Sequence, residues 1–100
     1  MLKHIVMWKL RDQAEGADKA TNVLRAQALL QACSALVPGI LRFEVATARP
    51  GLEATYDLLL YTEFTDRAAL AAYQQHPQHV AAKPFMKAVV QERQCMDYEV

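Results

Sequence analysis

The segment Leu2–Leu10 constrains the fold most, because its side chains alternate with a period of two residues. Apolar groups dominate one of its faces, which consists of His4, Val6, Trp8 and Leu10. The other face mixes basic and apolar groups, namely Lys3, Ile5, Met7 and Lys9. This period predicts a β-strand. Since both faces carry apolar side chains, we expect both to be covered at least in part.

One helix and a pair of strands follow. The polar segment Arg11–Ala17 is expected to be a loop, and apolar positions at helical spacing predict a helix over Asp18–Leu36. Asp18 is the expected N-cap, and Pro38-Gly39 ends the helix. Alternation then predicts strands over Ile40–Ala48 and Tyr56–Phe64. A turn at 49–51 (Arg-Pro-Gly) joins these two strands into an antiparallel hairpin.

Prolines divide the second helical region. We predict a helix over Arg67–Gln75 that is capped by Thr65 or Asp66. Pro77 suits the first turn of a new helical segment. Because proline is costly inside a helix, a further short turn or helix is expected over 84–90, and a last strand over 93–98.

The resulting order, β-α-β-β-α-β, is that of the ferredoxin-like α+β fold. We therefore predict one domain over residues 1–100, with a four-stranded antiparallel sheet and its helices on one face. The other face would expose large apolar side chains: Ile5, Met7, Leu59, Tyr61 and Met96. Such a patch is usually covered, so we expect a homodimer in which two sheets form a dimeric α+β barrel.

Charge and cysteine usage exclude several classes of protein. The chain has 11 basic and 11 acidic residues, so no basic face predicts a nucleic-acid partner. No apolar stretch approaches a membrane span, and the broken N-terminal run does not resemble a signal peptide. Two isolated cysteines, Cys33 and Cys95, are typical of reduced thiols. We expect a cytoplasmic protein.

Several short motifs resemble the stress-responsive A/B barrel (Dabb) family over essentially the whole chain. They are Lys3-His4-Ile5-Val6, Val37-Pro38-Gly39-Ile40, Tyr61-Thr62-Glu63-Phe64, Tyr73-x-x-His76-Pro77-x-His79 and Asp97-Tyr98-Glu99. The His-Pro-x-His segment after the second helix is the most specific of them. The resemblance implies a dimeric α+β barrel, and most of the family lacks an assigned activity.

A plant branch of this family includes polyketide cyclases, which close an aromatic ring by aldol-type chemistry. The resemblance to that branch implies that His79 is a catalytic base assisted by Tyr73. The histidine of the first strand corresponds to His4. Val6, Trp8 and Leu60 share the expected pocket wall with His4.

Each candidate also has a structural interpretation. An imidazole with an ordinary pKa of about 6.5 suits proton abstraction, but His79 at a helix start can equally bond a carbonyl. The Tyr73 phenol can stabilise an oxyanion or be a core residue with a hydroxyl at the edge. His4 stands among apolar neighbours and needs a hydrogen-bond partner in either role. We interpret His76 as structural.

No cofactor and no metal are expected. His4, His76 and His79 could in principle share an ion, but no carboxylate or cysteine stands at a recognisable ligand spacing. The chain has three glycines and no phosphate-binding loop.

Three functions stay open. The chain binds a small molecule between sheet and helices, with or without cyclase- or isomerase-type turnover. Alternatively, it is a non-enzymatic stress-response dimer. The third, a small monooxygenase, rests on analogy of fold alone.

Overall fold

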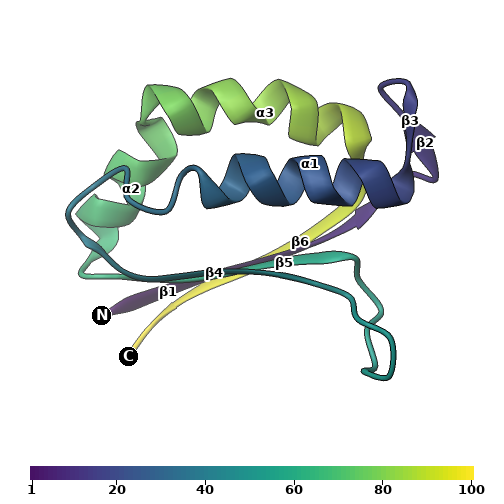
Figure 1. Ribbon diagram of the computed structural model, residues 1–100. Coiled ribbons are helices and arrows are strands. Elements are labelled where there is room, and N and C mark those ends of the chain that lie inside the picture. Colours follow the sequence, from purple (N-terminus) through teal and green to yellow (C-terminus); the bar gives the residue numbers. More distant parts are fainter.

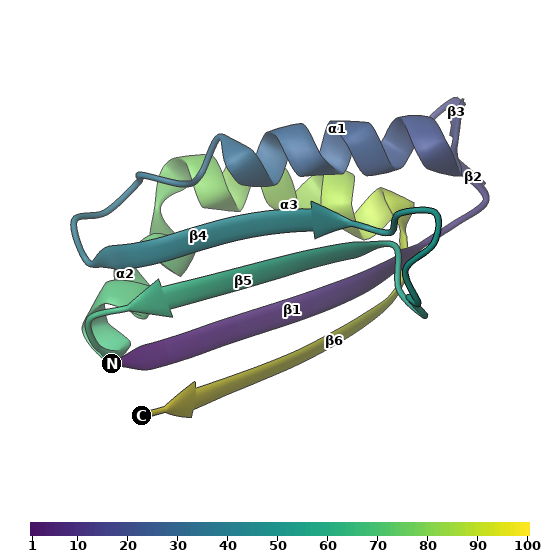
Figure 2. The ribbon, with the colours of Figure 1, turned by 60° about the horizontal axis from the view of Figure 1, so that its bottom comes forward.

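A computed structural model describes all residues, 1–100, as two layers (Figure 1). The strands and helices in chain order are β1 Leu2–Leu10, β2 Gln13–Ala14, β3 Ala17–Asp18, α1 Lys19–Gln31, β4 Ile40–Thr47, β5 Leu58–Phe64, α2 Arg67–Gln75, α3 Pro77–Val89 and β6 Val90–Glu99. Four strands form an antiparallel sheet in the order β4-β5-β1-β6 (Figure 2). The helices cover one face only, which confirms the predicted ferredoxin-like α+β fold.

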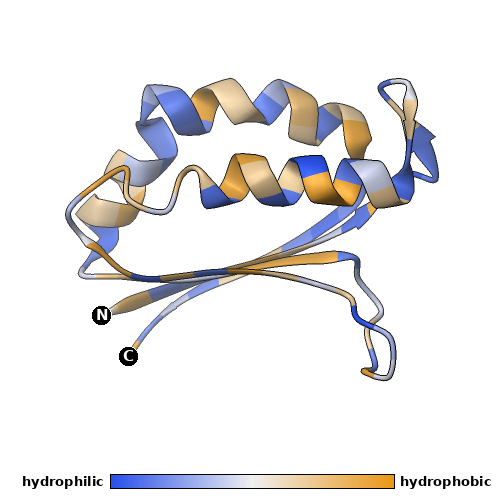
Figure 3. Ribbon diagram, in the orientation of Figure 1, coloured by the Kyte–Doolittle hydropathy of each residue, from blue (hydrophilic) through white to orange (hydrophobic).

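The alternation in β1 positions the core. His4, Val6, Trp8 and Leu10 are buried beneath the helices, whereas the intervening residues are half-buried on the outer face. On β5 the inner face is Leu58, Leu60, Thr62 and Phe64. The hydropathy colouring shows that β5 is largely hydrophobic and β6 largely hydrophilic (Figure 3). The helix-covered face is therefore apolar at its centre and polar at the β6 edge.

The first helix begins where the sequence predicts and ends earlier. The Asp18 carboxylate accepts the backbone N–H of Thr21 at 2.9 Å, which confirms the N-cap. The helix ends at Gln31 and not at Leu36, so that part of the prediction is wrong. Cys33, Leu36 and Val37 lie in turns and bends and still pack against the core. Their apolar spacing therefore resembles that of a helix.

The expected loop over Arg11–Ala17 contains a small hairpin, β2–β3, which sequence analysis missed. Glu15 and Gly16 both have positive φ angles, +50° and +71°, as a two-residue hairpin turn requires. The buried Asn22 of α1 donates to the carbonyl of Ala14 at 2.8 Å. The hairpin is thereby fixed against α1.

The region after β5 forms two helices rather than three segments. Asp66 caps α2 by accepting the N–H of Ala69 at 2.8 Å, and Pro77 is in the first turn of α3. The predicted break at Pro84 is wrong, because α3 continues through it to Val89. Val80 and Pro84 are both exposed, so the hydrogen bond that proline removes is not sealed from water.

Strand bounds differ in detail from the prediction. β5 begins at Leu58 instead of Tyr56, β4 ends at Thr47, and β6 starts at Val90 directly after α3. The outer face carries the predicted apolar groups in register: Ile5 lies beside Tyr61 and Met96, and Met7 beside Leu59. The β4–β5 loop projects on this same side (Figure 1). None of the helices has the length and apolarity needed to cross a bilayer.

Candidate functional site

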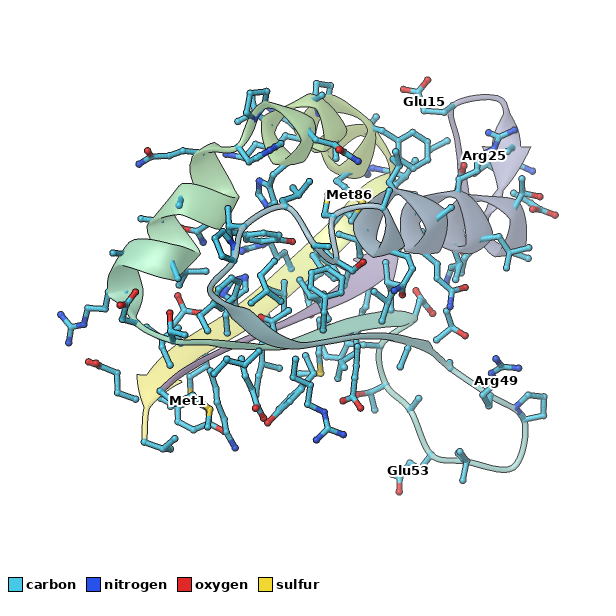
Figure 4. The ribbon with its side chains drawn as sticks, turned by 60° about the vertical axis from the view of Figure 1, so that its left-hand side comes forward. Met1, Glu15, Arg25, Arg49, Glu53 and Met86 are labelled. Carbon is cyan, nitrogen blue, oxygen red and sulfur yellow. The ribbon has the colours of Figure 1, made fainter.

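A cleft of about 1110 Å³ lies between α3 and the sheet. α1 packs across β4, β5 and β1, whereas α3 contacts mainly α1, α2 and the β2–β3 hairpin. Only its C-terminal end, at the fully buried Val89, belongs to the same core cluster as β1. Met86 extends from the side of α3 that faces the sheet (Figure 4). Five of the six residues proposed from sequence line the cleft, namely His4, Val6, Trp8, Leu60 and His79.

The strand pairing of β1 with both neighbours holds His4. Its cross-strand partners are Thr62 on β5 and Asp97 on β6. Thr62 donates its hydroxyl to the His4 carbonyl at 2.7 Å, and His4 Nδ1 lies 2.5 Å from Asp97 Oδ1. A carboxylate only accepts, so the proton between the two groups is on Nδ1, and Nε2 is the ring nitrogen left for another partner.

The turn between α2 and α3 brings Tyr73 and His79 together. His76 has an extended backbone, and its Nδ1 accepts the N–H of Gln78 at 3.1 Å. Pro77 then starts α3 with a φ angle suited to a helix. As a result, the rings of Tyr73 and His79 meet edge to face with centroids 4.7 Å apart. The interpretation of His76 as structural agrees with its role as the helix cap.

Tyr73 lies behind the cleft wall and does not line it. The residue is fully buried, with its ring against Phe43, Phe64 and His79 at centroid distances of 6.1, 5.3 and 4.7 Å. Its hydroxyl has no hydrogen-bond partner. Burial, and to a smaller extent the nearby Cys33, raise the pKa of Tyr73, so the phenol stays protonated.

His79 is the second imidazole of the cleft. Its Nδ1 is buried and lacks a hydrogen-bond partner. Burial lowers the pKa of His79 first, and the positive charge of Lys83 lowers it further. The backbone of Gln74 acts in the opposite direction, while His4 and Arg93 add small lowering effects. The side chain is therefore a neutral imidazole at pH 7, the form that accepts a proton.

Sequence analysis missed Asp97 as a site residue, although it belongs to the C-terminal motif. The place of Asp97 on the inner face of β6 could have indicated its role. That face is known only once the pairing of β6 with β1 is known, and His4 and Asp97 are 93 positions apart in the chain. Sequence analysis also missed the charged rim of the cleft, which consists of Lys83, Lys87, Glu92 and Arg93. Nowhere do three metal-binding side chains of the His, Cys, Asp or Glu type come together.

The arrangement combines an apolar cavity with two differently held imidazoles. Val6, Trp8 and Leu60 provide an apolar floor, and His4 and His79 both line the same cleft. One imidazole is oriented by a carboxylate and the other is kept neutral by burial. Such a pair can remove a proton from carbon and exchange a proton with an oxygen in one bound molecule.

The fold and this cleft define the class of ferredoxin-like α+β proteins that hold a pocket between sheet and helices. A family model described as the stress responsive A/B barrel domain (Dabb) matches residues 2–100. The chain belongs to this family. A comparison with curated proteins finds no match.

Solved structures agree with the family. A dimeric protein of unknown function with a ferredoxin-like fold from Bacteroides fragilis is 33% identical, with a TM-score of 0.81 over 99% of this chain and 95% of that one. A Dabb family protein from Mesorhizobium loti is 24% identical, with a TM-score of 0.65 over 99% and 95%. A candidate antibiotic biosynthesis monooxygenase from Nitrosomonas europaea is 19% identical, with a TM-score of 0.77 over 100% and 98%, and shares the fold.

Proposed function

We propose that this protein binds a small apolar molecule with a carbonyl group in the cleft and removes a proton from the carbon next to that carbonyl. The reaction class is a cyclase- or isomerase-type step driven by the two imidazoles. The observation that carries the proposal is that His4 and His79, which are 75 positions apart in the chain, line one apolar cleft. One imidazole would accept the proton from carbon, and the other would interact with the carbonyl oxygen.

His79 is the proposed base. Its neutral ring accepts the proton from carbon, and the electron pair that is released moves onto the carbonyl oxygen as an enolate forms. His4 is the proposed partner of that oxygen: with Asp97 at Nδ1, the protonated form of His4 carries its second proton on Nε2 and donates it to the enolate oxygen. Asp97 fixes the orientation of the ring, as a carboxylate behind a catalytic histidine commonly does.

Tyr73 is proposed as a positioning residue, since the wall of the cleft separates it from a ligand. Its unpartnered hydroxyl and the unpartnered Nδ1 of His79 belong to rings in contact. A neutral imidazole that accepts a proton at Nε2 carries its own proton on Nδ1, and the phenol oxygen can accept a hydrogen bond from that Nδ1–H. Such a hydrogen bond would fix the orientation of His79 and leave Nε2 free to accept the proton from carbon.

The outer face of the sheet is proposed as the homodimer interface. Met96 is 66% exposed, and the half-buried Ile5, Met7, Leu59 and Tyr61 extend the same apolar face. The neighbour from Bacteroides fragilis is described as dimeric. Pairing two such faces leaves both clefts open on the far, helix-covered side of each sheet.

Deuterium exchange tests the proposed chemistry without knowledge of the natural substrate. The protein is incubated in D2O at pD 7.4 with 2-nonanone or 4-phenyl-2-butanone, and NMR follows exchange of the hydrogens next to the carbonyl. The parent protein is expected to exceed the buffer rate. His79→Gln should lose this excess by about 100-fold, in line with the usual contribution of a general base.

His76→Asn is the matched control, because asparagine is also an N-cap residue and position 76 is outside the cleft. It should keep the parent rate. Tyr73→Phe should lower the rate less than His79→Gln and shift its pH profile, since it changes only the support of His79. If the parent and His79→Gln exchange deuterium equally, the assignment of the base is wrong.

Binding without turnover is the second candidate function. It is favoured by the sealed position of Tyr73, which leaves no phenol in the cleft to stabilise an oxyanion. In that case 2-nonanone raises the melting temperature of the parent by mass action, while no deuterium enters the ketone.

A further inference from the structure

The cationic rim of the cleft is the strongest feature that the proposed function leaves unexplained. Lys83 and Lys87 of α3 and Arg93 of β6 all line the cleft. None of them takes part in an ion pair, since the ion pairs of the chain involve other basic residues. Because the chain as a whole has zero net charge, this is a local surplus rather than a general one.

The one acidic residue of the cleft lining does not neutralise the rim. Glu92 is in register with Lys9 on the outer face of the sheet. Its carboxylate accepts the Tyr56 hydroxyl at 2.5 Å and lies 3.9 Å from Lys9 Nζ. The Glu92 charge is therefore committed to neighbours outside the cleft.

The cations come from both walls. Lys83 and Lys87 follow His79 at intervals of four residues, so all three share one side of α3. Arg93 is the cross-strand partner of Trp8 and reaches the cleft from the edge of the sheet. Its Nη1 lies 3.4 Å from the sulfur of Cys95 and has no carboxylate partner. The cations thus line the cleft from two sides, with Trp8 in its floor.

We propose that the ligand of this cleft is a small organic acid, whose carboxylate binds between Lys83 and Arg93 while its apolar part lies on Trp8. This inference rests on the proposed function, because it assigns the charge of the molecule that the same cleft binds. An arginine and a lysine from opposite walls suit a carboxylate, which accepts charge-assisted hydrogen bonds on both oxygens. An anion there also compensates the charges that disfavour a protonated His79.

The test uses two probes with the same tail, octanoate and octanamide, which differ in charge. Trp8 is the only tryptophan of the chain and lines the cleft, so its fluorescence reports binding directly. Octanoate is expected to bind the parent about five- to tenfold more tightly than octanamide, as a charge-assisted contact at an exposed rim provides. Added salt should weaken only the octanoate complex.

Variants that remove these charges identify the residues responsible for the preference for octanoate over octanamide. In the double variant Lys83→Gln/Arg93→Gln, octanoate and octanamide should bind equally, with the octanamide affinity unchanged. Arg25→Gln makes the same kind of change on α1, outside the cleft (Figure 4), and should keep the parent preference. A preference for octanoate that survives in the double variant would overturn the assignment to these two residues.

Two further outcomes separate this inference from the proposed function. If both probes alter Trp8 fluorescence with equal affinity, the cleft binds apolar molecules and the anionic ligand is wrong. If neither probe alters it at millimolar concentration, the cleft itself is not a binding site and the proposed function fails with the inference.

Discussion

The helix layer covers its sheet unequally, and the difference separates the packed core from the candidate site in this molecule. Over β4 and β5, α1 packs directly on the strands; we call this the sealed half. Over β1 and β6, the cleft lies between α3 and the strands; we call this the open half. The sealed half places apolar groups such as Leu58 and Ala26 in one core cluster, at 1% and 0% exposure. The open half presents histidines and cations to the cavity.

The same strand serves both halves. Val6 and Trp8 of β1 belong to the apolar cluster that α1 completes, and both also line the cleft. A floor of paired strands keeps the geometry of His4 fixed. Sites on strands are generally held more exactly than sites on loops.

The largest effect is expected in the sealed half. Leu58→Ala should lower the free energy of unfolding by about 2–5 kcal/mol, because a fully buried leucine leaves a cavity. Urea denaturation monitored by circular dichroism measures this change. Met86→Ala, the counterpart that lines the cleft and is half-buried, should cost less than about 1 kcal/mol. Equal losses at the two positions would remove the distinction between the halves.

A smaller loss is expected where the chain leaves α1 and passes beside α2. A Cβ added at Gly39 would lie 2.4 Å from the Ala69 Cβ and 2.8 Å from the Thr65 hydroxyl oxygen. The Gly39 carbonyl also accepts the N–H of Thr65 at 2.9 Å, so the backbone cannot move away freely. Gly39→Ala should therefore cost about 1–3 kcal/mol in urea denaturation. An unchanged urea midpoint would show that the chain has room for a methyl group at position 39.

The smallest effect concerns pH and belongs to the open half. His79 faces Lys83 on its own helix, the backbone of Gln74, and His4 and Arg93 from the sheet, and its pKa is lowered. As pH falls below about 6.5, the unfolded chain binds the proton first, so the stability of the fold declines until the lowered pKa is passed. Urea midpoints at pH 7.5, 6.5 and 5.5 should show this decline in the parent. His79→Gln should reduce this loss of stability. A rise in the stability of the parent on acidification would contradict a lowered pKa of His79.

The sequence predicted well wherever local periodicity and tertiary packing agree. The alternation in β1 and β5 predicted the inner face correctly, including four lining residues of the cleft, because a strand in a two-layer fold has one buried side. Where the two disagree, the prediction was wrong. Cys33 and Leu36 continue the helical spacing of α1, yet the chain turns after Gln31 and buries them from turns.

The candidate site was predictable in its residues more than in its contacts. His79 lies in a recognisable motif, but the pairing of His4 with Asp97 depends on the register of two strands from opposite ends of the chain. Local patterns carry no information on such a register. The sealed position of Tyr73 depends likewise on how sharply α2 turns into α3 at His76.

The central claim is that ligands enter the open half between α3 and β1. The most direct test is a titration of 15N-labelled protein with octanoate, followed by two-dimensional NMR. We expect the largest shifts at the Trp8 indole N–H and at the amides of His79 to Lys87, with the α1 residues outside the cleft, such as Arg25, little changed. If the largest shifts fall instead on the outer face, at Tyr61 and Met96, the cleft is not the functional site and the account is contradicted.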